Sequence, residues 1–323
     1  MLIGIVGNEA SDADSIVCAI VLAYLYNALY PENKYIPFMQ KSFKKVHTRF
    51  DFLKICEISN FHEIDLFDTT HLALNDDADE CMQVDEWILV DHNFPTMMQI
   101  KKIREIIDHH AIEGSHEGVL GPVFIEEVAS CATLIAERVV HSGISFPTNM
   151  YQILYLTIIV DSNNLSKSKT TEKDLKSIHQ LLALLPPGVA DSTNEWYEQI
   201  CDAKTDPNFW NNASIPDMLE QDFKKFHMGI YRVGIAVILR PAHTLDKLQI
   251  DAYIALNAYN VFVVIGKLEN GNKDIYLWGE EVPRILPKLI KKFDFVNLQN
   301  GFYEIQKKIT RKKFSPFLRD LLV

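Results

Sequence analysis

The sequence lacks the features of a secreted, disulfide-bonded or membrane-spanning protein. Its first residues form a strand-like run without the basic region that opens a signal peptide. Its longest apolar stretch, residues 16–30, has only 15 residues and contains Asn27, which is typical of a buried helix. Scattered cysteines without a CxxC spacing favour reduced thiols over a disulfide framework or a zinc site: Cys18, Cys56, Cys81, Cys131 and Cys201. We therefore expect a cytoplasmic protein that makes no membrane contact.

Positive charge is also scarce, because the formal net charge is −11. This excess of acidic residues argues against non-specific binding to nucleic acid. The charge is unevenly distributed: residues 1–200 carry 14 basic and 29 acidic side chains, whereas residues 201–323 carry 18 basic and 14 acidic ones. The asymmetry suggests that the first part binds cations and the second an anion, although an ordinary solvated surface would give the same numbers.

Strand-like and helix-like segments alternate in the first part of the chain. Compact apolar runs occur at Leu2–Val6, Trp87–Val90, Ile103–Ile107 and Leu154–Val160. Apolar residues have helical spacing from Ser15, a suitable N-cap, to about Leu29, and a second helix begins with the small residues 129–133, whose amides could approach an anion. This alternation predicts a mostly parallel sheet with helices on both faces. The continuous run 154–160 fits a strand or the end of a buried helix equally well.

The second part of the chain predicts a smaller α/β domain. Three strand-like runs and one helix-like run follow each other at Val233–Leu239, Val261–Lys267, Asp274–Trp278 and Val282–Phe293. A stretch rich in Pro, Asn, Asp and Thr precedes them and is typical of a connector. We therefore predict an α/β fold with a metal-binding catalytic domain at 1–190, a connector at 191–212 and a substrate-binding domain at 213–323.

Four polar clusters follow apolar runs, at residues 7–15, 91–93, 108–110 and 161–164. In parallel sheets, ligands bind beyond the carboxyl ends of the strands, which is where we place all four clusters. Carboxylates and imidazoles gathered there are suited to hold two divalent cations for phosphate chemistry. Each cluster alone is weak, since a DxD is usually a polar turn and an HH pair is often accidental. Four clusters in succession are harder to explain by chance.

The spacing within the clusters suggests how two metals would be shared. Asp12 and Asp14 are one residue apart, so they can reach two neighbouring ions from one turn, and Asp91 can bridge both ions with its two oxygens. His109 and His110 point in different directions, so that one can bind metal while the other faces the substrate. The carboxylate of the fourth cluster, Asp161, closes the set. A water bridging the two cations would be acidified and become the nucleophile.

The end of the chain is basic. Residues 304–323 carry six basic and two acidic side chains, among them Arg311 and Lys312. A solvated terminal face would explain this composition. Beside a metal site for phosphate chemistry, however, we expect these two cations to bind phosphate.

These motifs together resemble the DHH phosphoesterase superfamily, and the second part is similar to its DHHA2 subfamily domain. The resemblance rests on the ordered motifs GNEASDADS, VDHN, DHH, DSNN and TRKKFSPFL and covers nearly the whole chain. The superfamily includes family II inorganic pyrophosphatases, eukaryotic cytosolic exopolyphosphatases and prune-type proteins. Family II pyrophosphatases begin the first motif with a metal-binding histidine, whereas this chain has Asn8, as exopolyphosphatases and prune do.

The resemblance implies a role for each matching residue. The first metal would be held by Asn8, Asp12 and Asp91. The second would be held by Asp14, Asp91, His109 and Asp161. His110 would contact the phosphate or the bridging oxygen, and phosphates would be clamped by Arg311, Lys312 and, in a less secure match, Lys224. An amide oxygen is a harder ligand than imidazole, so Asn8 should favour Mg²⁺ over Mn²⁺ or Co²⁺ as the two cations.

The function that follows is a magnesium-dependent exopolyphosphatase, which releases terminal phosphate from inorganic polyphosphate through a metal-bridging hydroxide. The resemblance implies a monomer. A pyrophosphatase or a prune-like enzyme acting on short chains or phosphodiesters is the near alternative. A prune-like interaction protein with weak catalysis is an alternative of another class, and the glycine-rich signature of nanoRNase-type phosphodiesterases is not found.

Overall fold

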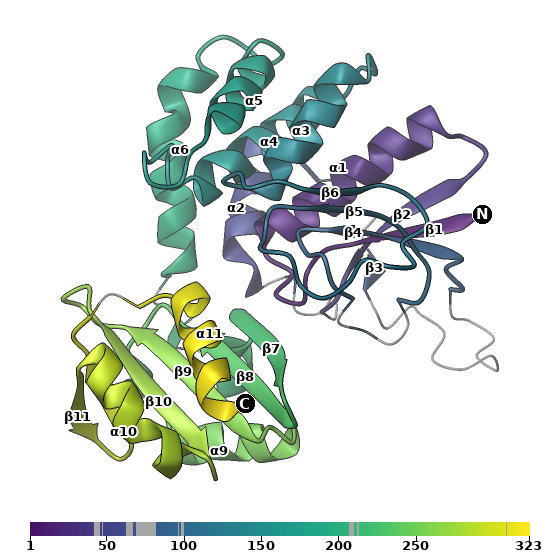
Figure 1. The fold of residues 1–323 in the computed structure, drawn as a ribbon. Helices are drawn as coiled ribbons and strands as arrows, with labels where there is room; N and C mark the ends of the chain where they lie inside the picture. Colours follow the sequence, from purple (N-terminus) through teal and green to yellow (C-terminus); the bar gives the residue numbers. More distant parts are fainter. Residues whose placement is uncertain are drawn as a thin grey trace. The chain divides into compact units, whose positions relative to one another are not determined.

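The computed structural model describes residues 1–41, 46, 48–62, 67–68, 82–95, 97, 100–206, 210–211, 213–307 and 309–323 (Figure 1). The chain divides into two compact units, Met1–Lys204 and Thr205–Val323. Each unit contains a sheet with its own hydrophobic cores. The expected α/β fold, with a parallel sheet followed by a smaller second domain, is therefore confirmed.

The sheet of the first unit is parallel throughout. Its strands are β1 (Leu2–Val6), β2 (Lys34–Met39), β3 (Phe67–Asp68), β4 (Glu86–Val90), β5 (Ile103–Asp108) and β6 (Val123–Ile125). They are arranged in the order β3-β2-β1-β4-β5-β6, and every pair is parallel. The order reverses between β1 and β4, because β2 lies on one side of β1 and β4 on the other. Such a reversal leaves a crevice beyond the carboxyl ends of the two central strands.

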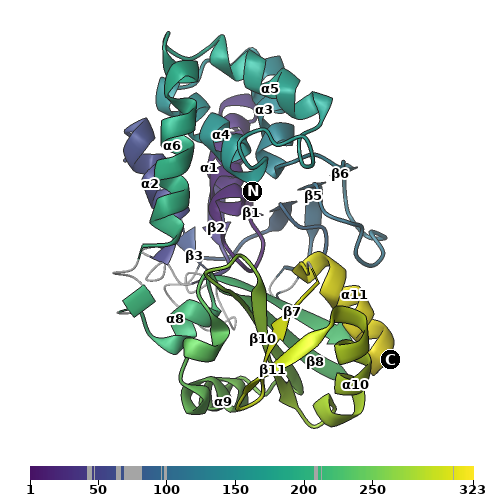
Figure 2. The same ribbon diagram turned by 90° about the vertical axis from the view of Figure 1, so that its left-hand side faces the viewer.

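The described residues of this unit form α1 (Ala13–Leu29), α2 (Phe50–Ser59), α3 (Cys131–His141), α4 (Thr148–Asp161), α5 (Glu172–Leu182) and α6 (Val189–Lys204). Helices α1 and α3 pack closely on the strands, and the other four pack on helices. All six contribute buried side chains to one large core, which also takes Ile3, Ile88 and Ile107 from the central strands. Figures 1 and 2 show these helices gathered on one side of the sheet. We expected helices on both faces. In the described part of the chain, the opposite core is instead covered by loop residues, including Met97 and Ile100.

The run 154–160 is the end of helix α4 and not a strand. Its side chains from Leu154 to Val160 are all buried, so no polar face reveals the helical period. The helix has apolar neighbours on every side because α1, α2, α3, α5 and α6 all contact it. Asp161 therefore follows a helix, whereas the other three clusters follow strands.

The second unit has a mixed six-stranded sheet. Its strands are β7 (Asp222–Met228), β8 (Tyr231–Val237), β9 (Val261–Lys267), β10 (Lys273–Gly279), β11 (Phe295–Gln299) and β12 (Phe302–Ile305), in the order β11-β12-β10-β9-β8-β7. Only the β8–β9 pair is parallel. One face packs on α8 (Ile215–Leu219), η3 (Ala242–Thr244) and α9 (Lys247–Leu256), and the other on α10 (Val282–Phe293) and α11 (Arg311–Leu322).

The boundary between the two units, after Lys204, falls within the connector that we expected at residues 191–212. Much of the expected connector, residues 191–204, lies in helix α6, which packs on α2 and α4 of the first unit. The catalytic and substrate-binding roles of the two parts stay predictions. None of the helices in the described ranges combines the length and apolarity needed to cross a membrane. Of the five cysteines, Cys81 lies outside the described residues, and the other four are free thiols.

A glycine in β1 leaves room for the side chain of a tryptophan in the neighbouring strand. Gly4 is directly paired with Trp87 of β4, and a Cβ at this position would lie 2.5 Å from the indole ring. We predict that Gly4→Ala lowers the free energy of unfolding by about 1–3 kcal/mol, because the buried ring has no room to move. Urea denaturation measures the loss. In the Trp87→Leu background the same substitution should cost clearly less, and an equal cost in both backgrounds would contradict the packing explanation.

Candidate metal centre

Three of the four predicted clusters meet at the carboxyl ends of adjacent strands. The loop 7–12 follows β1, Asp91 directly follows β4, and Asp108 ends β5 and is followed by the two histidines. Because β1, β4 and β5 are parallel neighbours, their ends lie at one edge of the sheet. This edge includes the reversal of strand order between β1 and β4.

Asp91 is the centre of the cluster. It is 2% exposed and adopts a left-handed backbone conformation (φ 60°), which is unfavourable for a residue with a side chain. One carboxylate oxygen, Oδ2, accepts hydrogen bonds of 2.7 Å from Asn8 Nδ2 and from Ser15 Oγ. The other, Oδ1, lies 3.3 Å from His109 Nε2 and 3.6 Å from His110 Nδ1. One oxygen is thus fixed by protein donors, and the other faces the histidines.

Asn8 orients Asp91 in this structure. Its amide nitrogen donates to Asp91, while its oxygen accepts from the backbone N–H groups of Ala10 (2.8 Å) and Ser11 (3.2 Å). To bind a metal through that oxygen, as the resemblance implies, Asn8 would have to share or release these N–H groups. Its role as a ligand stays a prediction.

Ser15 has a role that the sequence did not suggest. We expected it to cap helix α1, but the N-cap is Asp12, whose Oδ1 accepts from the Ser15 backbone N–H at 3.2 Å. The Ser15 hydroxyl instead accepts from the Asn8 N–H at 2.9 Å and donates to Asp91. Gly7 permits this approach, because a Cβ there would lie 2.5 Å from Ser15 Cβ.

His109 is held in the orientation of a metal ligand. Its Nδ1 lies 2.9 Å from the backbone oxygen of Val128, so Nδ1 carries the proton and donates it. Nε2 then points at Asp91 Oδ1 and, at 3.8 Å, at Asp14 Oδ2. Burial alone would lower the pKa of His109, but the hydrogen bond and charge of Asp91 and the charge of Asp14 raise it to about 10. In the absence of a cation, a proton on Nε2 links these carboxylates.

His110 is oriented by Asp108, for which the sequence suggested no separate role. Asp108 is fully buried, and its Oδ1 lies 2.9 Å from His110 Nδ1 and accepts the His109 backbone N–H at 2.7 Å. Its Oδ2 accepts from Asn93 at 2.6 Å. Burial would raise the pKa of Asp108, but these hydrogen bonds and the charges of the two histidines lower it to about 2. The ionised carboxylate fixes the His110 ring.

Asp14 occupies the amino terminus of helix α3. Its Oδ2 accepts from the backbone N–H of Cys131 at 2.7 Å, and its Oδ1 accepts from the N–H of Ala132 at 2.9 Å and the hydroxyl of Ser130 at 2.8 Å. The small residues that open α3 thus receive an anion, as their pattern suggested, but the anion is part of the chain. Burial and the charge of Asp91 raise the pKa of Asp14 to about 6.

Asp161 belongs to the same electrostatic cluster. Burial raises its pKa well above the ordinary value, and the nearby charges of Asp14 and Asp12 raise it further. Lys204, at the end of α6, partly offsets this charge. Lys204 pairs with Asp51 at 3.1 Å, and no motif in the sequence indicated either residue. Directly after the helix, residues 163–165 all adopt left-handed conformations, which fixes the turn at its end.

The donor atoms fit a divalent cation. One atom each from Asp91, His109 and His110 lies within 4.8 Å of the others, and further carboxylates adjoin this group. Burial and the charge of Asp12 raise the pKa of Asp91 to about 7, because two or more buried carboxylates repel each other. Oxygen and imidazole ligands suit Mg²⁺, Mn²⁺ or Co²⁺. His110 reaches this group through Nδ1, which Asp108 also binds, and its contact with substrate stays a prediction.

The predicted phosphate-binding cations lie in the second unit. Arg311 and Lys312 are in the first turn of α11, and Lys224 lies on β7. Arg311 Nη1 donates to Asp222 Oδ1 (2.5 Å) and to the Asp222 backbone oxygen (3.1 Å). Lys224 is two residues from Asp222, so both side chains project from the same face of the sheet. Lys312 is exposed.

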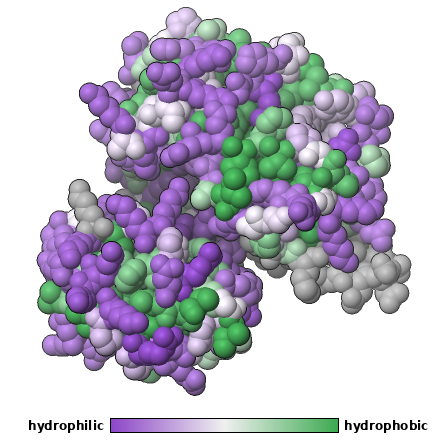
Figure 3. Space-filling model, in the orientation of Figure 1, coloured by the Kyte–Doolittle hydropathy of each residue, from purple (hydrophilic) through white to green (hydrophobic). Residues whose placement is uncertain are grey.

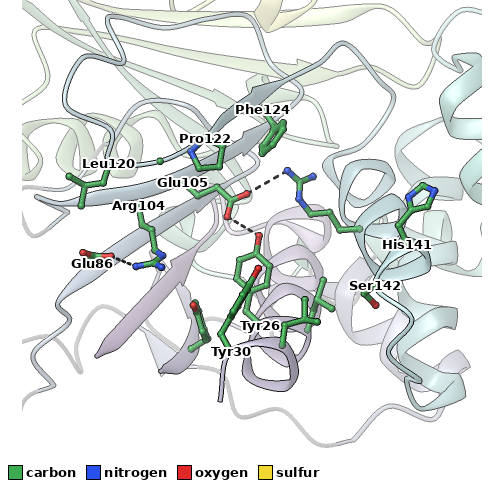
Figure 4. A pocket seen from close by; sticks show the side chains of 15 residues that line it. Tyr26, Tyr30, Glu86, Arg104, Glu105, Leu120, Pro122, Phe124, His141 and Ser142 are labelled. Atoms are coloured by element: carbon green, nitrogen blue, oxygen red, sulfur yellow. Dashed lines mark hydrogen bonds and ion pairs between the residues drawn. The ribbon is translucent and has the colours of Figure 1, made fainter. Parts of the chain in front are cut away.

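A separate cavity of 680 Å³ lies toward the amino end of β5 (Figure 4). Its charged groups are already paired. Arg104 donates a hydrogen bond of 2.7 Å to Glu86. Glu105 accepts a hydrogen bond of 2.8 Å from the Tyr26 hydroxyl and lies 3.5 Å from Arg138. Ligands of parallel sheets bind at the opposite ends of the strands, so we place the chemistry at the aspartate and histidine cluster.

The pKa values predict an unusual dependence of stability on pH. The folded protein keeps protons on Asp14 and Asp91 that the unfolded chain releases above about pH 4, so stability falls as pH rises toward 7. The contribution of protonated His109 is complete below pH 6.5 and is lost as pH rises toward 10. With a chelator present, we expect the free energy of unfolding to fall by several kcal/mol between pH 5 and 9.

Urea denaturation across this pH range measures the effect, with and without saturating Mn²⁺. The metal should reverse the slope, because binding requires the same groups to lose their protons. Asp91→Asn should flatten the slope in chelator. A stability that rises with pH in the metal-free protein would contradict the assignment.

Comparison with known proteins agrees with this arrangement. Residues 2–160 match the DHH family, N-terminal domain. Human exopolyphosphatase PRUNE1 is 29% identical over 244 residues, which cover 73% of this chain and 51% of that protein. A protein of Exiguobacterium sp., named as a manganese-dependent inorganic pyrophosphatase, is 28% identical over 258 residues, or 74% of this chain and 77% of that one. The chain thus spans about half the length of its mammalian relatives.

A solved structure shares the whole fold. A Methanococcus jannaschii protein, assigned as a family II inorganic pyrophosphatase, superimposes over 99% of both chains with a TM-score of 0.66 at 21% identity. This likeness concerns the fold alone. Residues 2–160 of this chain thus carry the match to the amino-terminal domain of the DHH family.

Proposed function

We propose that the protein is a metal-dependent exopolyphosphatase that hydrolyses the terminal phosphoanhydride bonds of inorganic polyphosphate. The observation that carries the proposal is the position of His109 Nε2, 3.3 Å from Asp91 and 3.8 Å from Asp14 at the switch point of the sheet. A backbone oxygen fixes the ring from the other side. Relatives named as exopolyphosphatases and manganese-dependent pyrophosphatases support the same class of reaction.

The residues of the first unit would bind and orient the reacting groups. Asp14, Asp91 and His109 would hold divalent cations, with Asp12 and Asp161 completing the set. Such cations supply Lewis-acid activation of water and neutralise phosphate oxygens. The cations would also relieve the repulsion that raises the pKa values of these carboxylates.

The residues around the ligands would hold them rigidly. Asn8 and Ser15 keep Oδ2 of Asp91 in place, so that Oδ1 keeps its direction toward the histidines. Asp108 keeps a proton on Nδ1 of His110. The opposite ring nitrogen, Nε2, would then exchange a proton with a phosphate oxygen or with the attacking water.

The second unit would bind the phosphates. Arg311 is suited to this role because its guanidinium is already fixed by Asp222, which lowers the entropy lost on binding. Lys312 and Lys224 add positive charge on the first turn of α11 and on β7. The amino end of α11 itself favours an anion.

An inorganic pyrophosphatase is the second candidate. The Exiguobacterium relative, which is matched over 77% of its length, favours it. The choice of Mg²⁺ or Mn²⁺, a monomeric state and a cytoplasmic location remain predictions from the sequence.

The first experiment compares phosphate release from pyrophosphate, tripolyphosphate and long-chain polyphosphate, with Mg²⁺ and with Mn²⁺. We expect the polyphosphates to be hydrolysed at least about tenfold faster than pyrophosphate at equal terminal-group concentration. Asp91→Asn should lower kcat by about a thousandfold or more, because this carboxylate contacts both histidines. Dominant pyrophosphate turnover would favour the second candidate, and no turnover of any substrate would favour a binding protein.

The residue at position 8 gives a second test. Asn8→His would replace the donor to Asp91 by an imidazole, which prefers Mn²⁺ more strongly than an amide does. We expect tighter Mn²⁺ binding by calorimetry and a gain in pyrophosphate turnover relative to polyphosphate. Asn8→Ala is the matched control, since it removes the same hydrogen bonds and adds no ligand. If both variants change the substrate ratio equally, position 8 does not set substrate choice through metal binding.

A further inference from the structure

Two lysines of the second unit face each other across the β9–β10 hairpin. Lys267 ends β9 and Lys273 begins β10, and the antiparallel register places them directly opposite. Side chains in such a pair project from the same face, with Cβ atoms about 5 Å apart. Two like charges in this position destabilise the strand pair. The hairpin therefore keeps an arrangement that a free protein alone would not favour.

Neither lysine has a partner that would offset this repulsion. Within the described ranges of the second unit, neither ammonium group forms an ion pair or a hydrogen bond. Lys267 is exposed, and Lys273 is half-buried. Burial lowers the pKa of Lys273; the charge of Asp222 raises it, and the charges of Arg311 and Lys267 lower it.

The pair lies on the same face of the sheet as α11. Side chains alternate along a strand, so Lys267 shares a face with Ile265, and Lys273 shares it with Ile275. Both isoleucines belong to the core that α10 and α11 cover. In the view of Figure 1, α11 crosses in front of the sheet, and the surface of the second unit on this side is mainly hydrophilic in Figure 3.

Arg311 adds a third cation whose position is fixed. Its side chain is 18% exposed and is held by Asp222, the carboxylate in contact with this group. The charge of Asp222 is shared between Arg311 and Lys273, so it compensates these cations only in part. An anion with a single charge could neutralise one of them. A chain of linked phosphates carries charge on every unit, so it can contact several fixed cations at once.

We propose that Lys267 and Lys273, with Arg311, form a subsite for the phosphates of a polyphosphate chain that are not being cleaved. This inference rests on the proposed exopolyphosphatase function and identifies a group of residues that favours long substrates over pyrophosphate. Lys267 and Lys273 act only in binding, so their loss raises KM for long chains and leaves kcat unchanged.

The test uses the full chain with the double substitution Lys267→Gln and Lys273→Gln. The matched control is Lys288→Gln with Lys291→Gln on α10, which removes the same charge from exposed positions. Phosphate release is measured with long-chain polyphosphate, tripolyphosphate and pyrophosphate. We expect KM for the long chain to rise about tenfold in the first variant, with kcat unchanged and KM for pyrophosphate within about twofold. The control variant should match the unmodified protein.

A second measurement separates this inference from the proposed function. Binding of long-chain polyphosphate is followed by calorimetry, which does not require hydrolysis. If the unmodified protein binds the chain but hydrolyses nothing, weaker binding by the lysine variant still supports the subsite while the enzymatic proposal fails. Suppose instead that the unmodified protein hydrolyses polyphosphate normally. If the lysine variant then keeps its KM for the long chain, or if its KM for pyrophosphate rises as much as its KM for the long chain, the subsite is wrong and the enzymatic proposal stands. Absence of binding by the unmodified protein overturns the subsite.

The thermal stability of the variant guards against a trivial loss of folding. Removing two opposed charges should leave Tm unchanged or raise it. Long-chain polyphosphate should raise the Tm of the unmodified protein more than that of the variant. An equal rise in both would contradict a role for these lysines in binding.

Discussion

The repulsion among buried carboxylates is the constraint on which the first unit depends. Asp14 and Asp91 are almost completely buried. The charge of Asp91 raises the pKa of Asp14, and the charge of Asp14 raises the pKa of Asp161. The pKa of Asp91 is itself raised by burial and by the charge of Asp12. Charges in such a place are costly unless they are paired. A fold that served stability alone would not collect them there. The arrangement becomes favourable when a cation supplies the missing positive charge.

The surrounding structure offsets part of this cost. The amino end of α3 donates two backbone N–H groups and a hydroxyl to Asp14. The amide of Asn8 and the hydroxyl of Ser15 donate to Asp91. These neutral donors stabilise the carboxylates without bringing a full charge, so the affinity for a cation is retained. The same contacts fix the directions of the oxygens, which is what a metal site requires before the metal arrives.

The sequence predicted the parts of this centre that local pattern determines. Strands β1, β4 and β5 were evident because compact apolar runs end in polar clusters, and parallel order then brings those ends together. The run before Asp161 could not be assigned because a helix buried on all sides has no polar face. The sequence could not show that Asp12, and not Ser15, is the N-cap of α1, since both residues suit that position. The close approach of Gly7 to Ser15 decides between them. Lys204 and Asp51 act through contacts distant in sequence, which no motif records.

The second unit shows the opposite imbalance. Among the described residues, Lys267, Lys273 and Arg311 bring positive charge to one face of its sheet, where Asp222 pairs with Arg311. On the proposed function, divalent cations would relieve the imbalance of the first unit, and phosphates that of the second. On the proposed function, the substrate complex supplies to each unit the charge that its own residues lack, and binding energy from phosphates far from the cleaved bond becomes available to favour long chains.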